Sequence, residues 1–235
     1  MSKPQYHLTL AGENALMLYF DQRIAPAISA LVQQACVLIR AELATDLIDV
    51  LPSYASVLVM FNPLSTDHFR VQAQLHHCLA NLHTSDSQGG KVVELPVYYS
   101  EESGPDLALI AQAKNISIDE VIQRHQAMSY RVYAIGFAPG FAYLGEIDPL
   151  LHMPRLATPR AKVPRGAVAI ADRQTAVYPA QSPGGWNLIG LCPTRMFNPA
   201  QTPAMPVSVG DEVRFIAIDK AEFLRLGGEL QGAGL

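Results

Sequence analysis

The sequence predicts an α+β protein in two parts, a small mixed domain followed by a domain of many short strands. In the first 84 residues, apolar side chains recur at helical and at strand spacing. After residue 130, short apolar runs are broken every few residues by Pro or Gly. The small, polar segment TSDSQGGK at 84–91 separates these two sequence patterns and resembles a linker. We therefore expect a domain at 1–84, a linker at 85–91, a barrel or sandwich at 92–225 and a frayed tail at 226–235.

The N-terminal domain is predicted to have the order strand, strand, helix, strand, strand, helix. Its first helix runs between Ile24 and Glu42 with Pro26 near its start, and Ser65 or Thr66 is expected to cap the second. The simplest way to bury both apolar patterns is to place two helices on one face of a four-stranded sheet. The expected strands are 6–10, 15–20, 47–51 and 56–61.

The second half is predicted to begin with a strand at 92–99 and two helices. The first helix covers 107–113, and a capping box of Ser117 and Glu120 opens the second, which ends near Ala127. A strand at 130–137 leads into the short strands that follow. Frequent turns between short strands fit a barrel and a sandwich equally well.

Composition excludes several classes of protein. A net charge of −4 argues against general binding to nucleic acids or membrane surfaces. The three cysteines, Cys36, Cys78 and Cys192, form no CxxC pair, so free thiols in a reducing compartment are expected. No apolar run of about 18 residues and no signal-like N-terminal segment is found, so we expect a cytoplasmic protein. The common nucleotide-loop, zinc-protease and nucleophile-elbow motifs are missing, and we expect no metal site.

Three loops rich in Gly and Pro contain the unusual chemistry. They are GFAPGFAYLG at 136–145, the stretch at 154–170 and the stretch at 174–190. Proline restricts φ and glycine permits positive φ, so such loops hold one shape, as a binding site requires. The alternative is that each loop is only a tight corner of the barrel.

The second loop is basic in an otherwise acidic protein. Arg155, Arg160, Lys162 and Arg165 occur between residues 149 and 171, and no acidic residue does. Guanidinium groups bind carboxylates and phosphates, so this run is either an anion site or a solvated face.

Five further residues are candidates for the site. The amides of Gly184 and Gly185 could form an anion-binding nest. Trp186, the only tryptophan, is either a buried anchor or a stacking wall for a planar ligand. His125, at a predicted helix C-terminus where protonation is favoured, is a candidate general acid or base, with a structural role as the alternative. Asp106 is expected to cap the helix after it, or to orient a ligand.

Together these residues resemble one family, the allophanate hydrolase subunit 1 or Kip-type kinase inhibitor family. The resemblance covers nearly the whole chain and is densest from 104 to 215. The matching residues are Gly104-Pro105-Asp106-Leu107, His125, Gly136-Phe137-x-Pro139-Gly140-Phe141-x-Tyr143-Leu144-Gly145, Pro154-Arg155, Pro159-Arg160, Val163-Pro164-x-Gly166, Gln174-Thr175, Tyr178-Pro179, Pro183-Gly184-Gly185-Trp186 and Gly210-Asp211-x-Val213-Arg214-Phe215.

The resemblance implies a cyclophilin-like barrel for the second domain and a role in a multi-subunit ATP-dependent 5-oxoprolinase. Such a complex opens the lactam of 5-oxoproline to glutamate, using ATP, expected with Mg²⁺, to convert the stable amide into a phosphate ester. The implied partners are a second cyclophilin-like subunit of C type and a lactam-cleaving third subunit of A type. Inhibition of a sensor histidine kinase and a urea or allophanate pathway are the alternatives, and prolyl isomerisation follows only from analogy of fold.

The site is expected where the three loops meet. His125 and Arg160 are the catalytic candidates. Arg165 departs from the family, in which a small residue usually stands there, and would alter substrate preference if it pointed into the site. The residues expected to bind substrate or ATP are Asp106, Phe137, Pro139, Gly140, Phe141, Tyr143, Arg155, Gln174, Tyr178, Gly184, Gly185 and Trp186.

Overall fold

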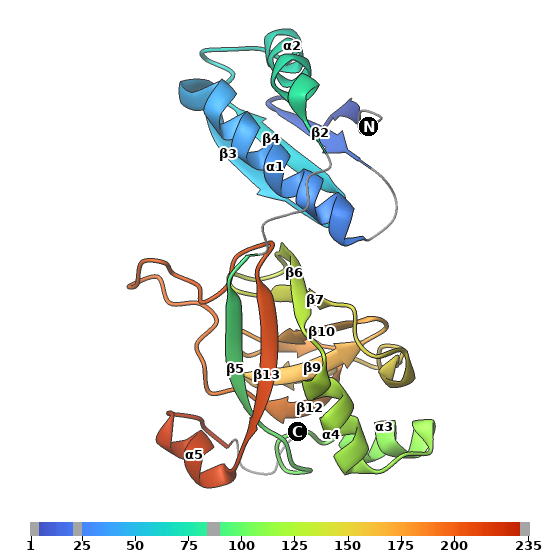
Figure 1. Ribbon diagram of the computed structural model, residues 1–235. Coiled ribbons are helices and arrows are strands. Elements are labelled where there is room, and N and C mark those ends of the chain that lie inside the picture. The colour runs from blue at the N-terminus through green and yellow to red at the C-terminus, as the bar shows by residue number, and fades with distance from the viewer. Residues whose placement is uncertain (1–4, 21–24, 84–89, 231–235) are drawn as a thin grey trace. The chain divides into compact units, whose positions relative to one another are not determined.

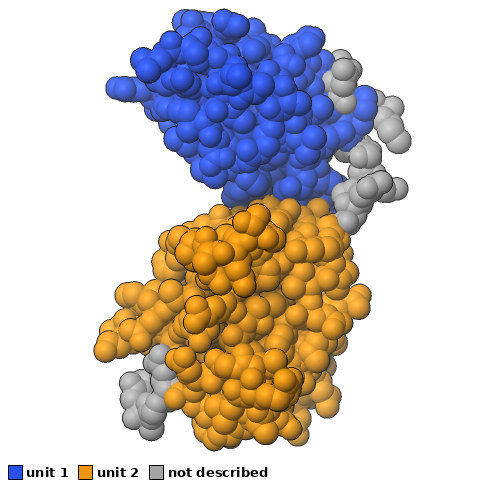
Figure 2. All heavy atoms as spheres, turned by 90° about the vertical axis from the view of Figure 1, so that its left-hand side faces the viewer, with its two compact units in different colours: residues 1–89 blue, residues 90–235 orange. Residues whose placement is uncertain are grey.

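Two units, residues 1–89 and 90–235, make up the chain (Figure 2). The computed structural model describes residues 5–20, 25–83 and 90–230. Most of the predicted linker, 85–89, and the end of the predicted tail, 231–235, lie outside these described residues.

Unit 1 is an antiparallel four-stranded sheet with two helices. The strand order is β1-β2-β4-β3, and α1 lies across one face of the sheet (Figure 1). One apolar core joins buried residues of both helices to those of β2, β3 and β4, so the helices share a face, as predicted. The elements are β1(His7–Leu10), β2(Ala15–Tyr19), α1(Pro26–Leu43), β3(Leu47–Pro52), β4(Ser56–Phe61) and α2(His68–Cys78), with short 3₁₀ turns at Ala44–Asp46 and Leu79–Asn81.

The helix starts of unit 1 agree only in part with the prediction. Pro26 stands at the first positions of α1, where its missing N–H costs no hydrogen bond. The cap of α2 is Asp67, whose carboxylate accepts from the Arg70 backbone N–H at 2.9 Å. The prediction of Ser65 or Thr66 is therefore wrong. Both belong to the preceding turn, in which their N–H groups donate to the Asn62 carbonyl.

One segment of unit 1, Pro26–Asp46, is long and apolar enough to cross a membrane by length and composition, with a mean hydropathy of 1.4. In the structure this segment contains α1, and a continuous face of that helix packs on the sheet. Its apolar character is thus explained by the core of unit 1. The buried residues of this face are Leu31, Val32, Ala35, Cys36, Ile39 and Leu43.

Unit 2 is a closed seven-stranded barrel, which decides between the predicted barrel and sandwich. The strand order is β10-β7-β6-β13-β5-β12-β9, and a two-stranded sheet of β11 and β8 lies beside it. Strands β5 and β13 run parallel and side by side, whereas the other neighbouring strands of the barrel are antiparallel (Figure 1). The strands are β5(Val92–Tyr98), β6(Tyr130–Ile135), β7(Ala142–Gly145), β8(Arg160–Val163), β9(Ala167–Ala171), β10(Gln174–Val177), β11(Ser182–Gly184), β12(Asn187–Leu191) and β13(Glu212–Ile218).

The helices of unit 2 are α3(Leu107–Lys114), α4(Ile118–Ala127) and α5(Lys220–Arg225), with a 3₁₀ turn at Pro149–Leu151. The Ser117 hydroxyl accepts from the Glu120 backbone N–H at 3.1 Å, which confirms Ser117 as the cap of α4. Cys192 is buried in this unit, and none of the three cysteines, all of which are described, forms a disulfide.

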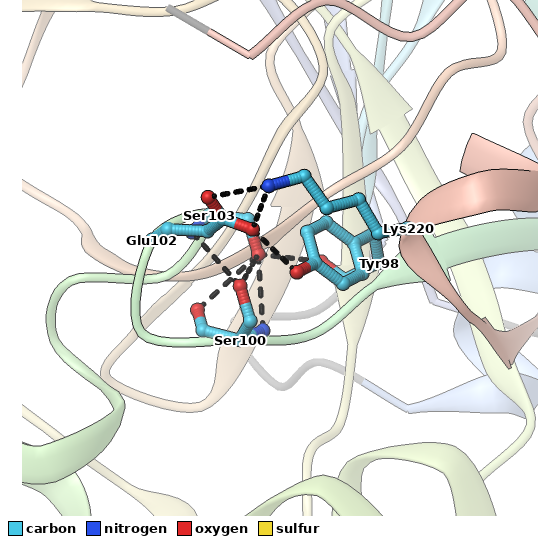
Figure 3. A network of polar contacts seen from close by, with 5 residues as sticks. All are labelled: Tyr98, Ser100, Glu102, Ser103 and Lys220. Atoms are coloured by element: carbon cyan, nitrogen blue, oxygen red, sulfur yellow. Dashed lines mark hydrogen bonds and ion pairs between the residues drawn. The ribbon is translucent and has the colours of Figure 1, made fainter. Parts of the chain in front are cut away.

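A polar network shapes the turn between β5 and α3 (Figure 3). Glu102 accepts from the Tyr98 hydroxyl at 2.6 Å and pairs with Lys220, the first residue of α5, at 2.9 Å. Ser103 donates through its hydroxyl to the Tyr98 carbonyl at 2.8 Å and contacts the Ser100 hydroxyl. These bonds fix the path of the chain into the 104–106 segment and attach α5 to it.

Gly104 lies directly against β12, and its replacement tests this close approach. A Cβ at this position would lie 2.2 Å from the Ile189 carbonyl carbon, so the backbones must separate. Gly104→Ala is expected to lower the free energy of unfolding of unit 2 by about 1–3 kcal/mol. Urea unfolding followed by the emission of Trp186, the only tryptophan, measures this change.

Gly136→Ala is the matched control, because a Cβ there meets no atom within 4 Å. Its free energy of unfolding should stay within about 0.5 kcal/mol of the wild type. Equal losses in both variants would contradict the steric explanation.

Candidate functional site

The three predicted loops meet at one pocket of about 120 Å³ in unit 2. The first loop contributes aromatic residues, the second an arginine, and the third two glycines, a proline and two aromatic residues. The structure therefore brings together most of the residues that the sequence singled out for binding. The lining consists of Phe137, Phe141, Tyr143, Arg155, Tyr178, Pro183, Gly184, Gly185 and Trp186.

Phe141 is the centre of the aromatic wall. It is only 2% exposed, and its ring meets four other rings edge to face. The centroid distances are 5.3 Å to Phe137, 4.9 Å to Tyr143, 5.3 Å to Tyr178 and 5.7 Å to Trp186. Edge-to-face pairs stabilise one another beyond their burial, so these contacts hold the rings of the wall together.

Gly140 and Pro139 contribute to the first loop through their backbone conformation and not through side chains in the pocket. Gly140 has φ +85°, and a Cβ there would lie 2.6 Å from the Met196 carbonyl oxygen. Pro139 is exposed, and neither residue lines the pocket. Phe137 adopts φ +68° and is 67% exposed, so it stands at the pocket edge in a conformation uncommon for a bulky residue. Gly140 and Pro139 thus shape the loop, and their contact with a ligand stays a prediction.

Arg155 supplies the charge of the pocket. Its guanidinium carbon lies 5.9 Å from the Trp186 ring centroid, within reach of a cation–π contact. Arg155 forms no ion pair with any residue that the structure describes, and no acidic side chain is among the described lining residues. A cation with no neighbouring carboxylate makes the pocket suited to an anion.

Trp186 is a buried anchor, and its stacking on a planar ligand stays a prediction. It is 5% exposed, as expected of a buried anchor, and it also forms part of the pocket wall. Burial raises the pKa of the nearby Tyr178 hydroxyl, partly offset by Arg155 and by a hydrogen bond from the Trp186 backbone. Tyr178 is therefore a neutral phenol at physiological pH. The anion nest at Gly184 and Gly185 remains a prediction.

Arg160 lies outside the pocket lining, in an ion pair. Its Nη2 lies 2.8 Å from Asp106 Oδ1. The second carboxylate oxygen of Asp106 accepts from the Leu188 backbone N–H at 2.6 Å. Asp106 occupies the N-cap position of α3, but its side chain makes no capping hydrogen bond, so the predicted capping role is wrong. The stronger charge-assisted bonds to Arg160 and β12 occupy the carboxylate instead.

His125 is fully buried, which contradicts its predicted role as a general acid or base. Its Nδ1 lies 2.8 Å from the Tyr99 hydroxyl, and its Nε2 lies 2.9 Å from the Thr175 hydroxyl. Because the Thr175 hydroxyl donates to the Ala169 carbonyl, it accepts from His125, and the hydrogen is on Nε2. Burial lowers the pKa of His125 to about 3, since desolvation outweighs the helix C-terminus.

Two other residues from the sequence prediction lie away from the pocket. Gln174 opens β10 opposite Gly145 and Ala171, and it is not part of the lining. Arg165 is 3.9 Å from Glu229 and does not line the pocket either, so the departure at this position does not change the wall. Pro183 does line the pocket and was not among the predicted site residues, although it belongs to the Pro-Gly-Gly-Trp motif that flags this turn.

The pocket does not suit a nucleotide. Pockets for drug-sized ligands measure roughly 300–1,000 Å³, and a nucleoside triphosphate belongs to that size class, whereas this pocket measures about 120 Å³. Within the described ranges, no three His, Cys, Asp or Glu side chains come together as a metal-binding group. The residues here fit a small organic anion, and binding of ATP by these residues is not supported.

Fold and site define a class of protein: a cyclophilin-like barrel with a small aromatic, cationic pocket, joined to an α/β unit. Comparison with known families identifies the class more closely. The sequence matches the family described as the carboxyltransferase domain, subdomain C and D, over residues 6–207. The chain therefore belongs to this family.

Curated relatives confirm the resemblance to the B-type subunits of 5-oxoprolinase. A Bacillus subtilis protein is 32% identical over 229 residues, which cover 93% of this chain and 95% of that protein. An Escherichia coli O157:H7 protein is 44% identical over 126 residues, which cover 54% of this chain and 58% of that protein. Both are named as the B-type subunit of 5-oxoprolinase.

Solved structures share the fold. TTHA0988 is 34% identical with a TM-score of 0.76 over 87% of this chain, and this chain spans only 40% of that longer one. PH0987 from Pyrococcus horikoshii is 40% identical with a TM-score of 0.56, over 92% of this chain and 100% of that protein. The Kluyveromyces lactis urea amidolyase, at 15% identity and a TM-score of 0.76 over 95% of this chain and 15% of its own, shares the fold alone.

Proposed function

We propose that this chain is the B-type subunit of a cytoplasmic, multi-subunit, ATP-dependent 5-oxoprolinase. The reaction converts 5-oxoproline, ATP and water to glutamate, ADP and phosphate. The observation that carries the proposal is the pocket, whose aromatic walls suit a small ring and whose Arg155, without an ion-pair partner among the described residues, suits a carboxylate. Identity of 32% along nearly the whole of a relative that is named as this type of 5-oxoprolinase subunit supports it.

Different pocket residues suit the carboxylate and the lactam ring of 5-oxoproline. The guanidinium of Arg155 can form a bidentate pair with the carboxylate. The lactam ring would lie against Phe141 and Trp186, where apolar burial favours it. The neutral Tyr178 phenol can donate a hydrogen bond to the lactam oxygen. In this arrangement the chain holds the lactam, and the nucleotide binds elsewhere in the complex.

Cleavage of the amide requires groups that this pocket does not provide. Among the nine described lining residues there is no Ser, Cys, His, Lys, Asp or Glu, so they offer no aliphatic hydroxyl, thiol, imidazole, amine or carboxylate as nucleophile or general base. The proposal therefore includes a second cyclophilin-like subunit and a lactam-cleaving third subunit, and the isolated chain is inactive. The greater length of TTHA0988 is in keeping with a module that works beside further protein.

Phosphate release from ATP, with and without 5-oxoproline, tests the proposal. We expect no 5-oxoproline-dependent release from the chain alone. Release that depends on 5-oxoproline should occur once the chain is co-purified with the products of its neighbouring genes. Failure in a well-formed complex would reject the 5-oxoprolinase role. Urea, allophanate and the autophosphorylation of a sensor histidine kinase would then be tested in its place.

A further inference from the structure

Asp106 connects the two flanks of the segment that contains Trp186. On one side it pairs with Leu188 of β12 twice, because its N–H donates to the Leu188 carbonyl at 3.0 Å and its carboxylate accepts from the Leu188 N–H at 2.6 Å. On the other side its carboxylate holds Arg160, the residue of β8 that pairs with Gly184 of β11. The single carboxylate of Asp106 is thus connected to both ends of residues 184–188, to Leu188 directly and to Gly184 through Arg160. We call residues 184–188 the bracketed segment.

The bracketed segment in turn holds the backbone on both sides of Arg155. Asn187 donates through Nδ2 to the Pro154 carbonyl at 2.9 Å. The Leu156 N–H donates to the Gly185 carbonyl at 2.7 Å. Arg155 lies between these two bonds, over the ring of Trp186. A shift of the bracketed segment would therefore move the cation and the aromatic wall of the pocket together.

The pair of Asp106 and Arg160 is protected from water. The Asp106 side chain is 8% exposed and that of Arg160 is 21% exposed. The Arg160 Nη1 is buried and has no hydrogen-bond partner in the described part of the chain, and Arg160 is not among the described lining residues of the pocket. Removing one member of such a pair leaves the other charge buried and uncompensated, and the backbone around it must rearrange.

We propose that Asp106 and Arg160 are positioning residues, whose ion pair sets the geometry of Trp186 and Arg155 without touching the ligand. Arg160 acts through Asp106, and Asp106 acts through β12. The inference rests on the proposed function only in its choice of 5-oxoproline as the ligand.

Quenching of Trp186 fluorescence by acrylamide tests the positioning without any ligand. Trp186 is the only tryptophan and is nearly buried, so its emission reports the pocket directly. Asp106→Asn and Arg160→Met are each expected to raise the quenching constant at least about twofold, because a loosened wall admits the quencher. Arg124→Met is the matched control, since Arg124 also forms ion pairs in unit 2, with Glu120 and Asp148, but lies outside the lining.

The affinity for 5-oxoproline, from a titration of the same emission, tests whether the two residues act as a unit. Each single variant should bind about tenfold more weakly, and the double variant no more weakly than either single, because coupled residues are not additive. Arg160→Lys, which keeps the charge, should recover part of the loss. Thermal unfolding of each variant establishes that it is folded at the assay temperature.

Three results would overturn the inference. One is a quenching constant in both variants equal to that of the wild type. Another is loss of affinity in Arg160→Met alone with Asp106→Asn unchanged, which would mean that Arg160 contacts the ligand. The third is additive losses in the double variant. If the wild type does not bind 5-oxoproline at all, the proposed function fails, while the quenching result still decides the positioning.

Discussion

Replacing Arg155 with methionine is expected to weaken 5-oxoproline binding by about 10- to 100-fold. A hydrogen bond to a charged group contributes roughly 1.5–3 kcal/mol, and Arg155 is the only cationic side chain among the described lining residues. Methionine keeps an unbranched apolar stem at this position, so the change mainly removes the guanidinium, with its charge and its contact with Trp186. Isothermal titration of the isolated chain with 5-oxoproline measures the loss.

Arg165→Met is the control for this prediction. Arg165 belongs to the same basic run, but it faces Glu229 and does not line the pocket. Its replacement should leave the affinity within about twofold, since screened surface charges contribute little. Arg155→Lys should give an intermediate affinity, because lysine keeps the charge and loses the bidentate geometry. Equal weakening by Arg155→Met and Arg165→Met would show a general charge effect and contradict a specific contact.

Most of the fold could be predicted because its signals are local. Alternating and helical apolar patterns predicted the four strands and two α-helices of unit 1, and Pro26 and Ser117 predicted where two helices begin. Closure of the barrel could not be predicted, since it depends on pairs far apart in the chain. Strand β13 pairs in parallel with β5 and antiparallel with β6, and neither register is visible in a local pattern.

The candidate site, too, could be predicted where its signals are local and not where they depend on residues far apart in the chain. Clustered Gly and Pro marked the loops that meet at the pocket, because stiff backbone is a property of the local sequence. The role of Arg160 could not be predicted, because its partner Asp106 lies 54 residues earlier in the chain. From the sequence alone, an arginine in a basic run is expected to bind an anion, because its buried carboxylate partner is not visible there. His125 shows the same limit, since burial among residues distant in the sequence, and not the end of its helix, sets the direction of its pKa shift.

The burial of His125 leads to the second large effect, a loss of stability in acid that His125→Gln should remove. In the unfolded chain a histidine takes up a proton near pH 6.5, whereas His125 in the folded protein does so only at a pKa of about 3. Between these values the unfolded state binds more protons, so the free energy of unfolding falls as the pH falls. The contribution is complete above about pH 6.5 and decreases by up to about 1.4 kcal/mol per pH unit below it. Urea unfolding of unit 2, followed by Trp186 emission, measures it.

Glutamine keeps a donor for Thr175 and an acceptor for Tyr99 but does not titrate. The variant should be less stable at pH 7, because it loses the ring that stacks on Phe215. Its deficit should then shrink steadily toward pH 4, since carboxylates titrate in both proteins and cancel in the difference. His77→Gln, at an exposed position of unit 1, should leave the transition of unit 2 unchanged at each pH. A deficit that stays constant from pH 7 to pH 4 would mean that His125 takes up its proton in the folded state, and it would return His125 to the catalytic candidates.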